Sequence, residues 1–524
     1  MSRSSFELLP RHSIDDSSDE LEDRVTLLPK PPDHIHPMTS NRLLRIRRLA
    51  KYYARQGHSV ISFIEKPFKT TCNCQKRSFR CVFRVILLLV GTFILLSALE
   101  ALLYPSYQTP PEHYQELRRK IDASKDSGRG NPNNEKIFIA ANIINASLIR
   151  GPWGRSVLEL IDILGEENVF ISIYENDSGN GTRDALRHFQ EKLPCNFSVA
   201  TGGHIPLSEL PAITTPSGEN RTKRIAYLAE VRNRALRPLN LKYTPHPHEV
   251  GFHHATMKFD RILFLNDIYF SPTDAAQLLF STNQNKYRAA CAIDFTSNVM
   301  FYDSFVVRDT NGYGMGLMFF PWFPPTGSAQ SRNAVLAESD AVPVRSCWGG
   351  MVSFDAVQFQ NMSTKYSPSI KSRFRHEPEP FWEGAECCLI FADLEDAYGE
   401  PNGKQGSGVF VNPYIRVAYT WNTWHWLGFF QRFERIFHNL QWIVSKIGYP
   451  EYNPRRLDRP GQLVKQKVWK NHEIGHGGSF QTVERTASPG GFCGQRRMFL
   501  MKRDLELANT RGEKNWEKLA VPWW

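Results

Sequence analysis

The sequence predicts an α/β fold in which helices cover a mostly parallel sheet, preceded by a single N-terminal transmembrane helix. From about residue 135 onward, short apolar runs typical of strands alternate with segments whose apolar residues recur at helical spacing. Such alternation is typical of parallel sheets, because each crossover between parallel strands needs a connecting helix. The run from Ile262 to Leu265 is apolar throughout, as expected for a strand buried on both faces.

The elements follow in chain order, and several carry their own boundary signals. Gly165 closes the first helix, Pro238 stops the third, and Ser271 with Pro272 gives the fourth a capping hydroxyl followed by proline. The expected strands are 136–144, 169–174, 261–267 and 287–295. The expected helices are 157–164, one that opens at Thr182, 224–236 and one from Ser271.

Residues 82–104 form the expected membrane span. The stretch 85–99 carries no charge, and Arg84 and Glu100 stand near the ends, where a side chain can reach the interface. A helix over this range covers roughly 34 Å, enough to cross a bilayer. A buried core helix is the alternative interpretation.

The charge in front of the span sets the expected orientation. Residues 41–84 hold 12 Lys or Arg and one acid, Glu65, so 12 − 1 = +11 accounts for the whole net charge of +11. This clustering places the N-terminus in the cytoplasm and removes the main argument for a nucleic-acid partner. We therefore expect a single-pass type II protein of the Golgi or another secretory membrane. Its parts would be a cytoplasmic tail 1–81, a signal anchor 82–104, a stem 105–134, a lumenal domain 135–500 and a C-terminal tail 501–524.

The cysteines and glycosylation sequons agree with this topology. Cysteines beyond the span number six, which permits up to three disulfides: Cys195, Cys291, Cys347, Cys387, Cys388 and Cys493. Cys291 lies in an apolar strand and is expected to be a buried free thiol. All sequons also follow the span, beginning at Asn145, Asn176, Asn180, Asn196, Asn220 and Asn361, which is expected of a lumenal glycoprotein.

Asn266 and Asp267 directly follow the apolar run, so they should lie at the carboxyl end of a strand. Ligands of open α/β sheets bind at that edge. A carboxylate there, with an amide beside it, can hold a hard cation against a phosphate. An ordinary Asn-Asp turn explains the pair equally well.

Other segments offer further candidates for a nucleotide site. The second strand runs into Glu175 and Asp177 in a Gly-rich loop and then a helix, where an acid can hydrogen-bond a base or ribose and the helix start favours phosphate. Arg308 offers a planar fork for a diphosphate. The alternatives are a polar loop and a surface ion pair with Asp309.

Two segments are candidates for sugar binding and catalysis. Trp348 offers a stacking face for a sugar, and Gly349 and Gly350 allow close backbone approach to a ligand. Glu386 is a carboxylate at a helix start beside an apolar wall. The alternatives are a tight turn with a core tryptophan and a carboxylate that merely complements the helix dipole.

The segment 472–476, HEIGH, fits the HExxH pattern of zinc proteases. That chemistry needs both histidines on one face of a stable helix. Gly475 and the glycines that follow make the segment a poor helix former. His472 or His476 is alternatively a lone metal or phosphate ligand on a loop.

Several segments together resemble the fungal capsule-associated proteins and the cryptococcal α-1,3-mannosyltransferase. The matching residues span about 135–500. The segments that carry the resemblance are 224–239 (RIAYLAEVRNRALRPL), 261–270 (RILFLNDIYF), 290–295 with 302–309, 346–356 (SCWGGMVSFDA), 383–389 (EGAECCL), 412–419 (NPYIRVAY) and 490–496 (GGFCGQR).

This resemblance implies a membrane-anchored glycosyltransferase of the GT-A type, with one Rossmann-like sheet. It implies GDP-mannose as donor, a mannoside or other glycan acceptor, an α-1,3 linkage, and a role in capsule or cell-wall polysaccharide synthesis. Asp267 would hold Mn²⁺ or Mg²⁺, with Asn266 beside it and His476 as a further metal ligand. The usual second aspartate is missing, because Leu265 and Tyr269 occupy its two possible places.

The resemblance also implies roles for the remaining candidates. Glu175 and Asp177 would bind the nucleoside, and Arg308 the diphosphate. Trp348, Gly349 and Gly350 would border the acceptor. Glu386 would be the carboxylate near the anomeric carbon. A transferase that uses another sugar nucleotide, a non-catalytic scaffold and, remotely, a zinc protease remain as alternatives.

Overall fold

The computed structural model describes residues 74–176, 178–201, 204–245, 250–315, 318–360, 373–398, 407–438, 441, 453–472, 476–505 and 514–523. The chain divides into two compact units, one ending at Leu103 and one running from Tyr104 to the C-terminus. Each unit is described by itself.

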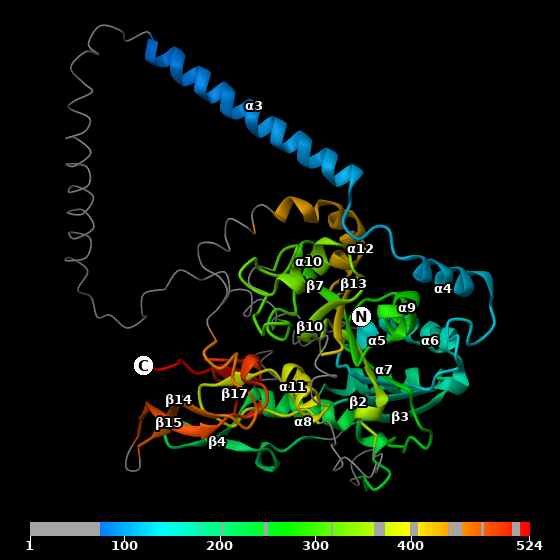
Figure 1. The fold of residues 1–524 in the computed structure, drawn as a ribbon. Coiled ribbons are helices and arrows are strands. Elements are labelled where there is room, and N and C mark those ends of the chain that lie inside the picture. Colours follow the sequence, from blue (N-terminus) through cyan, green and yellow to red (C-terminus); the bar gives the residue numbers. More distant parts are fainter. Residues whose placement is uncertain are drawn as a thin grey trace, which may run out of the picture. The chain divides into compact units, whose positions relative to one another are not determined.

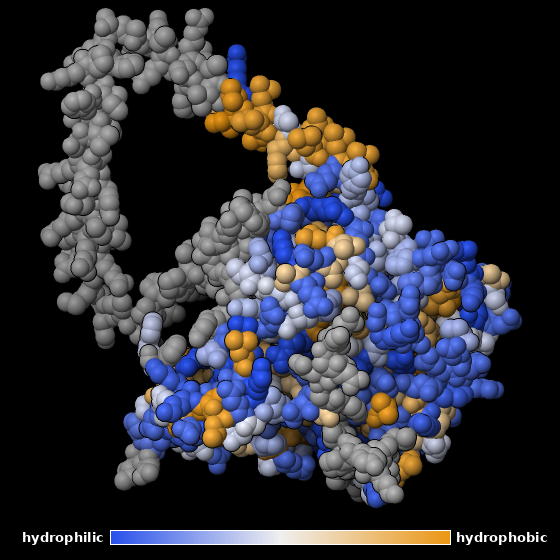
Figure 2. Space-filling view, in the orientation of Figure 1, coloured by the Kyte–Doolittle hydropathy of each residue, from blue (hydrophilic) through white to orange (hydrophobic). Residues whose placement is uncertain are grey.

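The first unit contributes the helix α3 (Cys74–Leu103). Within it, Phe83–Leu103 is long and apolar enough to cross a membrane, with a mean hydropathy of 2.5. Only 11% of the most apolar 18-residue stretch is buried. Figure 2 shows this helix as a nearly continuous apolar surface. The helix therefore fits the single N-terminal span that the sequence predicts, by length and composition.

The second unit is built on one ten-stranded sheet with the order β3-β2-β1-β6-β11-β7-β13-β10-β9, and β8 pairs with β7. Its strands are β1 (Ile137–Asn142), β2 (Val169–Tyr174), β3 (Asn196–Ala200), β6 (Arg261–Leu265), β7 (Ala289–Ser297), β8 (Met300–Phe301), β9 (Arg308–Asp309), β10 (Val342–Ser346), β11 (Met351–Asp355) and β13 (Val409–Ala418).

Most of the strands run in the same direction. β1 is parallel to β2 and β6, and β2 is parallel to β3. β11 runs antiparallel between β6 and β7, while β7 is parallel to β13. A mixed but mostly parallel sheet of this kind confirms the expected GT-A type fold.

Helices cover both faces of the sheet (Figure 1). Side chains of β1 alternate between two apolar clusters, with Phe138 in one and Ile139 in the other. The first cluster takes in α8 (Arg224–Ala235), α10 (Ala329–Leu336), α11 (Glu386–Tyr398) and α12 (Trp421–Phe430). The second takes in α4 (Glu112–Ala123), α5 (Ala146–Arg150), α6 (Pro152–Leu164), α7 (Asn180–Gln190) and α9 (Pro272–Phe280).

The boundary signals read from the sequence have the expected effects. Gly165 ends α6 with φ of +92°, a conformation that L side chains rarely adopt. The Ser271 hydroxyl accepts a hydrogen bond from the Asp274 amide at the start of α9. α8 ends at Ala235, ahead of Pro238. Local chemistry therefore sets these element ends.

Residues 105–134, expected as a stem, are part of the α/β unit. Tyr107 is 3% exposed and its hydroxyl donates to the Val335 carbonyl. In α4, Tyr114, Leu117 and Ile121 are buried. Their spacing is that of an amphipathic helix, which the surrounding Pro, Gly and charged residues obscure in the sequence. This segment is therefore packed on the domain rather than extended as a linker.

The prediction that Cys291 is a free thiol is wrong. Cys291 forms a disulfide with Cys347, and Cys388 forms one with Cys493. Cys195 and Cys387 are the buried free thiols among the described residues. The apolar pattern of β7 correctly indicates burial, but it carries no information on which residue lies opposite Cys291 in space.

The C-terminal part adds small two-stranded sheets beside the main one. β14 (Leu463–Asn471) pairs with β15 (Gly478–Thr486), and β17 (Phe499–Met501) pairs with β18 (Trp516–Lys518). The expected tail 501–524 therefore contributes a strand. β4 (Ala212–Thr214) pairs with β5 (Asn220–Thr222), and β12 (Glu383–Gly384) with β16 (Gly494–Gln495).

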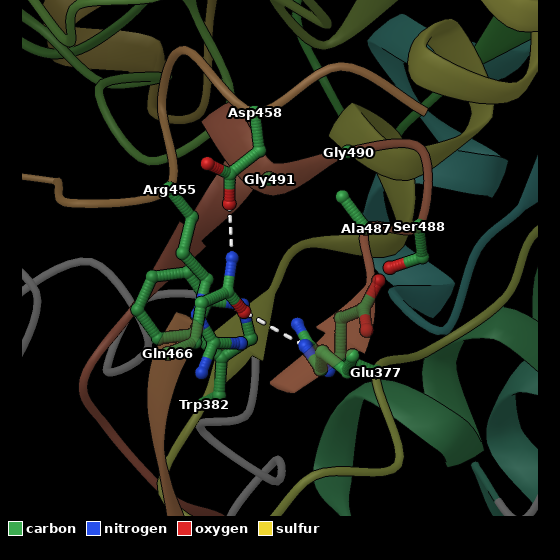
Figure 3. A pocket seen from close by; sticks show the side chains of 10 residues that line it. Glu377, Trp382, Arg455, Asp458, Gln466, Ala487, Ser488, Gly490 and Gly491 are labelled. Carbon is green, nitrogen blue, oxygen red and sulfur yellow. Dashed lines mark hydrogen bonds between the residues drawn. The ribbon is translucent and has the colours of Figure 1, made fainter. Parts of the chain in front are cut away.

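A small polar cavity lies beside the β14–β15 hairpin (Figure 3). Gln466 bridges its two sides, since its amide nitrogen donates to Asp458 and its amide oxygen accepts from Arg485. The cavity measures about 10 Å³, close to the smallest space that holds one water. It is therefore far too small for a sugar nucleotide.

Candidate functional site

Part of the predicted site gathers at the carboxyl edge of the parallel strands. Asn266 and Asp267 follow β6 directly. β11 runs the other way, so Trp348, Gly349 and Gly350, which precede it, meet the same edge. This is the edge at which open α/β sheets bind ligands.

Asn266 lies at the centre of this group. Its side-chain oxygen accepts from the Trp348 indole at 3.3 Å and from the Arg232 guanidinium at 3.5 Å. Its amide nitrogen lies 3.5 Å from the Tyr419 hydroxyl. Its backbone amide donates to the Gly350 carbonyl at 2.9 Å. The structure thus brings Asn266, Trp348 and Gly350 together, although they are distant in sequence.

The backbone of Asn266 is held from both sides as well. Besides the bond from its amide to Gly350, its carbonyl accepts a hydrogen bond from the Trp153 indole at 3.0 Å. Trp153 is fully buried in α6. The turn after β6 is therefore fixed by two elements besides its own strand, which keeps the Asn266 side chain in one place.

Arg232 links Asn266 to Glu386. Its Nε donates to the Glu386 carboxylate at 2.8 Å, and its guanidinium lies over the Trp348 ring, 4.4 Å from the centroid. Glu386 is the first residue of α11 and is 3% exposed. The expected position of Glu386 at a helix start is confirmed, and its partner Arg232 comes from α8, on the same side of the sheet.

Two further carboxylates, Asp294 and Asp303, hold the segment around Trp348. Asp303 accepts from the backbone amides of Trp348 at 2.7 Å and Gly349 at 3.0 Å. The Asp303 amide in turn donates to Asp294 at 3.0 Å. Both carboxylates are buried, so these charge-assisted bonds are strong and fix the turn.

Gly349 is required by this turn. Its φ is +58°, and a Cβ at this position would lie 1.9 Å from the Ala292 carbonyl oxygen in β7. Any side chain would therefore collide with the neighbouring strand. The sequence predicts close approach of a ligand to this turn. In the structure the close neighbour of Gly349 is the chain's own backbone, and approach of a ligand stays a prediction.

Tyr419 completes the network at the end of β13. Its hydroxyl donates to Asp294 at 2.9 Å. Burial, then the negative charge of Asp294, raises the pKa of Tyr419 well above its ordinary value, and Asp267 contributes in the same direction. The phenol therefore stays protonated, and Asp267 lies close enough to Tyr419 to influence it.

The described residues around Asn266 and Asp267 offer a metal ion few protein ligands. Asp267 is half-buried, and Asn266 turns its side-chain oxygen toward N–H donors rather than toward open space. Within the described residues, no group of three His, Cys, Asp or Glu side chains could enclose an ion. A Mg²⁺ or Mn²⁺ ion bound to Asp267 would have to take most of its remaining ligands from phosphate and water.

Glu175 faces the interior of its own loop. It is fully buried, and its carboxylate accepts from the Ser178 amide at 2.8 Å and from the Ser178 hydroxyl. Arg183 of α7 lies 3.7 Å away. Glu175 thus shapes the loop that the sequence assigned to the nucleoside. Asp177 lies outside the described residues.

Arg308 is buried, which is incompatible with a surface ion pair. Its guanidinium donates to the carbonyls of Phe492 at 3.0 Å and of its neighbour Val307 at 2.9 Å. These contacts tie β9 to the C-terminal segment. A diphosphate role for Arg308 stays a prediction, without a described contact that links it to Asn266 or Glu386.

The HEIGH segment connects the two strands of a hairpin. Asn471 pairs with Gly478, and the His472 amide donates to the Gly477 carbonyl. His476 is exposed and lies beside Gly218. Residues 473–475 lie outside the described residues. The two histidines lie between the paired residues Asn471 and Gly478, whereas zinc-protease chemistry needs both on one face of a stable helix, and no described contact joins His476 to Asp267.

Sequence reasoning missed Arg232, Tyr419, Asp294 and Asp303 as members of the site. Arg232 lies in a segment whose apolar spacing predicts a helix. Asp294 lies inside β7, near the end of the strand 287–295 that the sequence predicts, and Tyr419 directly follows β13. Charged or polar residues at strand ends are a signal that would have found the last two. Nothing in the helical spacing distinguishes Arg232 from the other arginines of α8.

Comparisons with solved structures give remote likenesses. The mannosyltransferase PcManGT from Pyrobaculum calidifontis, in complex with GDP-Man and Mn²⁺, is 11% identical with a TM-score of 0.29 and covers 69% of this chain and 76% of its own. Glucosyl-3-phosphoglycerate synthase from Mycobacterium tuberculosis, in complex with Mn²⁺, UDP and glucosyl-3-phosphoglycerate, is 12% identical with a TM-score of 0.28 and covers 71% and 96%. These values are too low to support an inference about activity.

Comparison with known sequences is more specific. No curated protein sequence matches the chain. Residues 136–393 match the family model described as Cryptococcal mannosyltransferase 1. This range contains the strands β1 to β11 and the network around Asn266, Arg232 and Glu386. The chain is therefore a glycosyltransferase that belongs to the cryptococcal mannosyltransferase family.

Proposed function

We propose that the chain is a type II membrane enzyme that transfers mannose from GDP-mannose to a mannoside acceptor, forming an α-1,3 linkage with retention. The observation that carries the proposal is the Arg232 guanidinium, held by Glu386 and Asn266 at the carboxyl edge of the sheet. It gives a fixed positive charge where a sugar diphosphate would lie. The family of the chain supports mannose as the transferred sugar.

Arg232 is suited to bind the diphosphate of the donor. A guanidinium carries five N–H donors, and the contacts of the described residues use two of them, toward Glu386 and Asn266. Its side chain is 16% exposed, so part of it can be reached from outside. A planar fork of this kind matches two phosphate oxygens. We assign the diphosphate to Arg232 before Arg308, whose donors go to backbone carbonyls.

Asp267 would hold Mn²⁺ or Mg²⁺ together with the donor phosphates. The bound ion would neutralise charge on the diphosphate as it departs. One carboxylate suffices for an ion whose other ligands are phosphate oxygens and water. The missing second aspartate of the family pattern fits this arrangement, because Leu265 is fully buried in β6 and cannot supply a ligand.

Retention of configuration at the anomeric carbon determines which groups the protein has to stabilise. An α product from the α-linked donor does not need a general base that activates an inverting attack. It needs stabilisation of the leaving diphosphate and of a positively charged anomeric carbon. Arg232 serves the first need. Glu386, whose carboxylate is already fixed by Arg232, is the candidate for the second.

Acceptor binding would involve Trp348, and the loop that Glu175 shapes would receive the nucleoside. Trp348 is 4% exposed and has Arg232 over its ring, so only a small part of it is accessible to a sugar. Gly349 and Gly350 keep the turn beside it narrow. Positioning of this kind lowers the barrier by holding the reacting groups in attack geometry.

The test is a screen of sugar nucleotides with the full-length protein in detergent, with and without Mn²⁺, and with mannosides as acceptors. We expect transfer from GDP-mannose and an α-1,3-linked product by NMR. Preference for another sugar nucleotide would correct the donor. Absence of turnover with every donor would favour the scaffold, and peptide cleavage inhibited by phenanthroline would favour the protease.

A further inference from the structure

The helix α12 presents an aromatic face to the outside. Its buried side carries Thr423 and Leu427. Its outward side carries Trp421, Trp426 and Phe429, which are 59%, 44% and 51% exposed. These three residues are called the aromatic face below. A surface helix of a globular protein ordinarily turns charged and polar residues outward. The exposed aromatic side chains of α12 are therefore unusual for a helix that faces only solvent.

The aromatic face is a continuous surface rather than scattered side chains. Trp421 contacts His425, which contacts Trp426, and Trp426 contacts Phe429, with ring centroids 5.8, 5.3 and 5.8 Å apart. Contacts along one helix do not bury these rings, as their exposure shows. Tryptophan and phenylalanine side chains gathered on one exposed helix face are typical of a helix that lies in a membrane interface.

The place of α12 in the chain favours a lipid surface as the partner. Directly after α12, the Gln431 side chain donates to the carbonyls of Ser106 at 2.9 Å and Tyr107 at 3.2 Å. Ser106 and Tyr107 are buried in the same unit. The apolar span ends at Leu103, only three residues before Ser106. Three residues of extended chain cover at most about 11 Å.

The end of α12 is therefore linked, through Ser106, to a point three residues along the chain from the end of the apolar span. We propose that the aromatic face docks on the phospholipid bilayer in which the chain is anchored. Arg432, exposed in the turn after the helix, adds a positive charge suited to lipid phosphates. The inference rests on the proposed membrane anchor and concerns a second, separate contact with the bilayer.

Docking of the aromatic face on the bilayer would also hold the candidate site close to the membrane surface. α12 begins directly after Tyr419 and its capping residue Thr420, and the Trp421 ring lies 6.0 Å from that of Tyr269, two residues beyond Asp267. The aromatic face thus extends from the edge of the site toward the membrane. The enzyme would accordingly act on acceptors held close to the membrane surface.

The experiment places the photoreactive residue p-benzoylphenylalanine at one position at a time in the full-length protein, reconstituted in phospholipid nanodiscs. Positions Trp426 and Phe429 test the aromatic face. Leu95, 61% exposed in α3, reports on the anchor, and Leu463, 68% exposed on β14, is the matched surface control. Mass spectrometry then detects phospholipid adducts after illumination.

We expect lipid adducts at Leu95, Trp426 and Phe429 and at least tenfold fewer at Leu463. Adducts at Leu95 with none at Trp426 and Phe429 would overturn the inference and leave the proposed anchor standing. Absence of adducts at Leu95 would overturn the anchor, and the inference with it. Equal adducts at Leu463 would show unspecific contact and also overturn it.

The competing occupant of the aromatic face is a glycan acceptor, since aromatic rings also stack on sugars. Trp426→Ala distinguishes the two. With a soluble mannoside acceptor, we expect KM to stay within about twofold of the wild-type value. A tenfold rise in KM, with lipid adducts absent at Phe429, would assign the face to the acceptor and overturn the bilayer inference.

Discussion

Two buried ion pairs join α8 to the segment that opens α11, and they differ in almost every other respect. Lys223 pairs with Glu383 at 3.6 Å, and Arg232 pairs with Glu386 at 2.8 Å. The first pair lies at the start of α8 and the second nine residues further along the chain. The comparison separates a contact that holds the fold from one that can act on a ligand.

The Lys223–Glu383 pair is sealed by the protein. Both side chains are essentially unexposed, and the Lys223 ammonium donates to the carbonyls of Glu377, Glu379 and Trp382. Glu383 accepts from the Phe499 amide. Burial lowers the pKa of Lys223 and raises that of Glu383 to about 7, so both groups move toward their neutral forms. Apart from each other, Lys223 and Glu383 bond to backbone groups, which indicates that the pair has a structural role.

The Arg232–Glu386 pair is open on one side. Arg232 is 16% exposed and contacts side chains of the candidate site, Asn266 and Trp348. A guanidinium cannot lose its charge in a protein, so burial leaves Arg232 positive. A pair of a basic and an acidic side chain is therefore structural where backbone carbonyls enclose it, as at Lys223. It can act on a ligand where it remains partly accessible and contacts the candidate site, as at Arg232.

Lys223→Met should have the largest effect, on the fold itself. It leaves three backbone carbonyls without their donor and Glu383 without its counter-charge, a change that costs about 3–5 kcal/mol for a buried pair. Thermal unfolding of the full-length protein in detergent measures this loss of stability. Arg232→Met is the matched control and should lower the melting temperature much less. Equal effects would erase the distinction between the pairs.

Arg232→Lys should affect turnover more than stability. Lysine keeps the positive charge but loses the planar fork that binds Glu386 and a phosphate at the same time. We expect transfer from GDP-mannose to fall about 100-fold, as for the loss of one preorganised donor at a site of developing charge. The melting temperature serves as control. Wild-type turnover in this variant would remove Arg232 from the site.

Trp348→Phe should have a smaller effect on the same network. Phenylalanine keeps an aromatic face under Arg232 but loses the indole N–H that donates to Asn266. One neutral hydrogen bond contributes about 1 kcal/mol, so turnover should fall roughly five- to tenfold. A loss as large as that of Arg232→Lys would mean that Trp348 contacts the substrate directly.

The smallest expected effect is a pH dependence of the stability, caused by the buried Lys223–Glu383 pair. Glu383 has a pKa of about 7 in the folded protein against 4.5 as its ordinary value, so the folded state holds this proton more tightly. The stability it adds is fully present below pH 4.5 and is lost as the pH rises through 7. The melting temperature of the wild type should therefore fall relative to Glu383→Gln across this pH range. A constant difference would contradict the assignment.

Much of the fold could be predicted, because local patterns determine it. The strand 169–174 is found with its predicted bounds, and Gly165, Ser271 and Pro238 act at the predicted helix ends. What could not be predicted depends on neighbours in space. The pairing of Cys291 with Cys347 and the packing of α4 on the domain bring together residues far apart in sequence, about which periodicity is silent.

The candidate site was predictable in its location and only partly in its members. The sequence predicts Asn266 at the carboxyl end of a strand and Glu386 at a helix start. That Trp348 lies beside Asn266 depends on the antiparallel direction of β11, which the sequence does not indicate. Arg232 was not predictable, because a helix that carries several arginines gives no sign of which one turns toward the sheet edge. Glu175 was expected to meet the nucleoside, but its side-chain direction depends on the loop that it closes.

The most direct test of the central claim compares Glu386→Gln with the wild type, using GDP-mannose and a mannoside. With the Glu386 carboxylate beside the reacting carbon, as proposed, turnover should fall by a factor on the order of 1000 in the variant. GDP affinity, measured by calorimetry, should change by less than about threefold, because the diphosphate contacts come from Arg232 and Asp267. Near-normal turnover in Glu386→Gln would contradict the account.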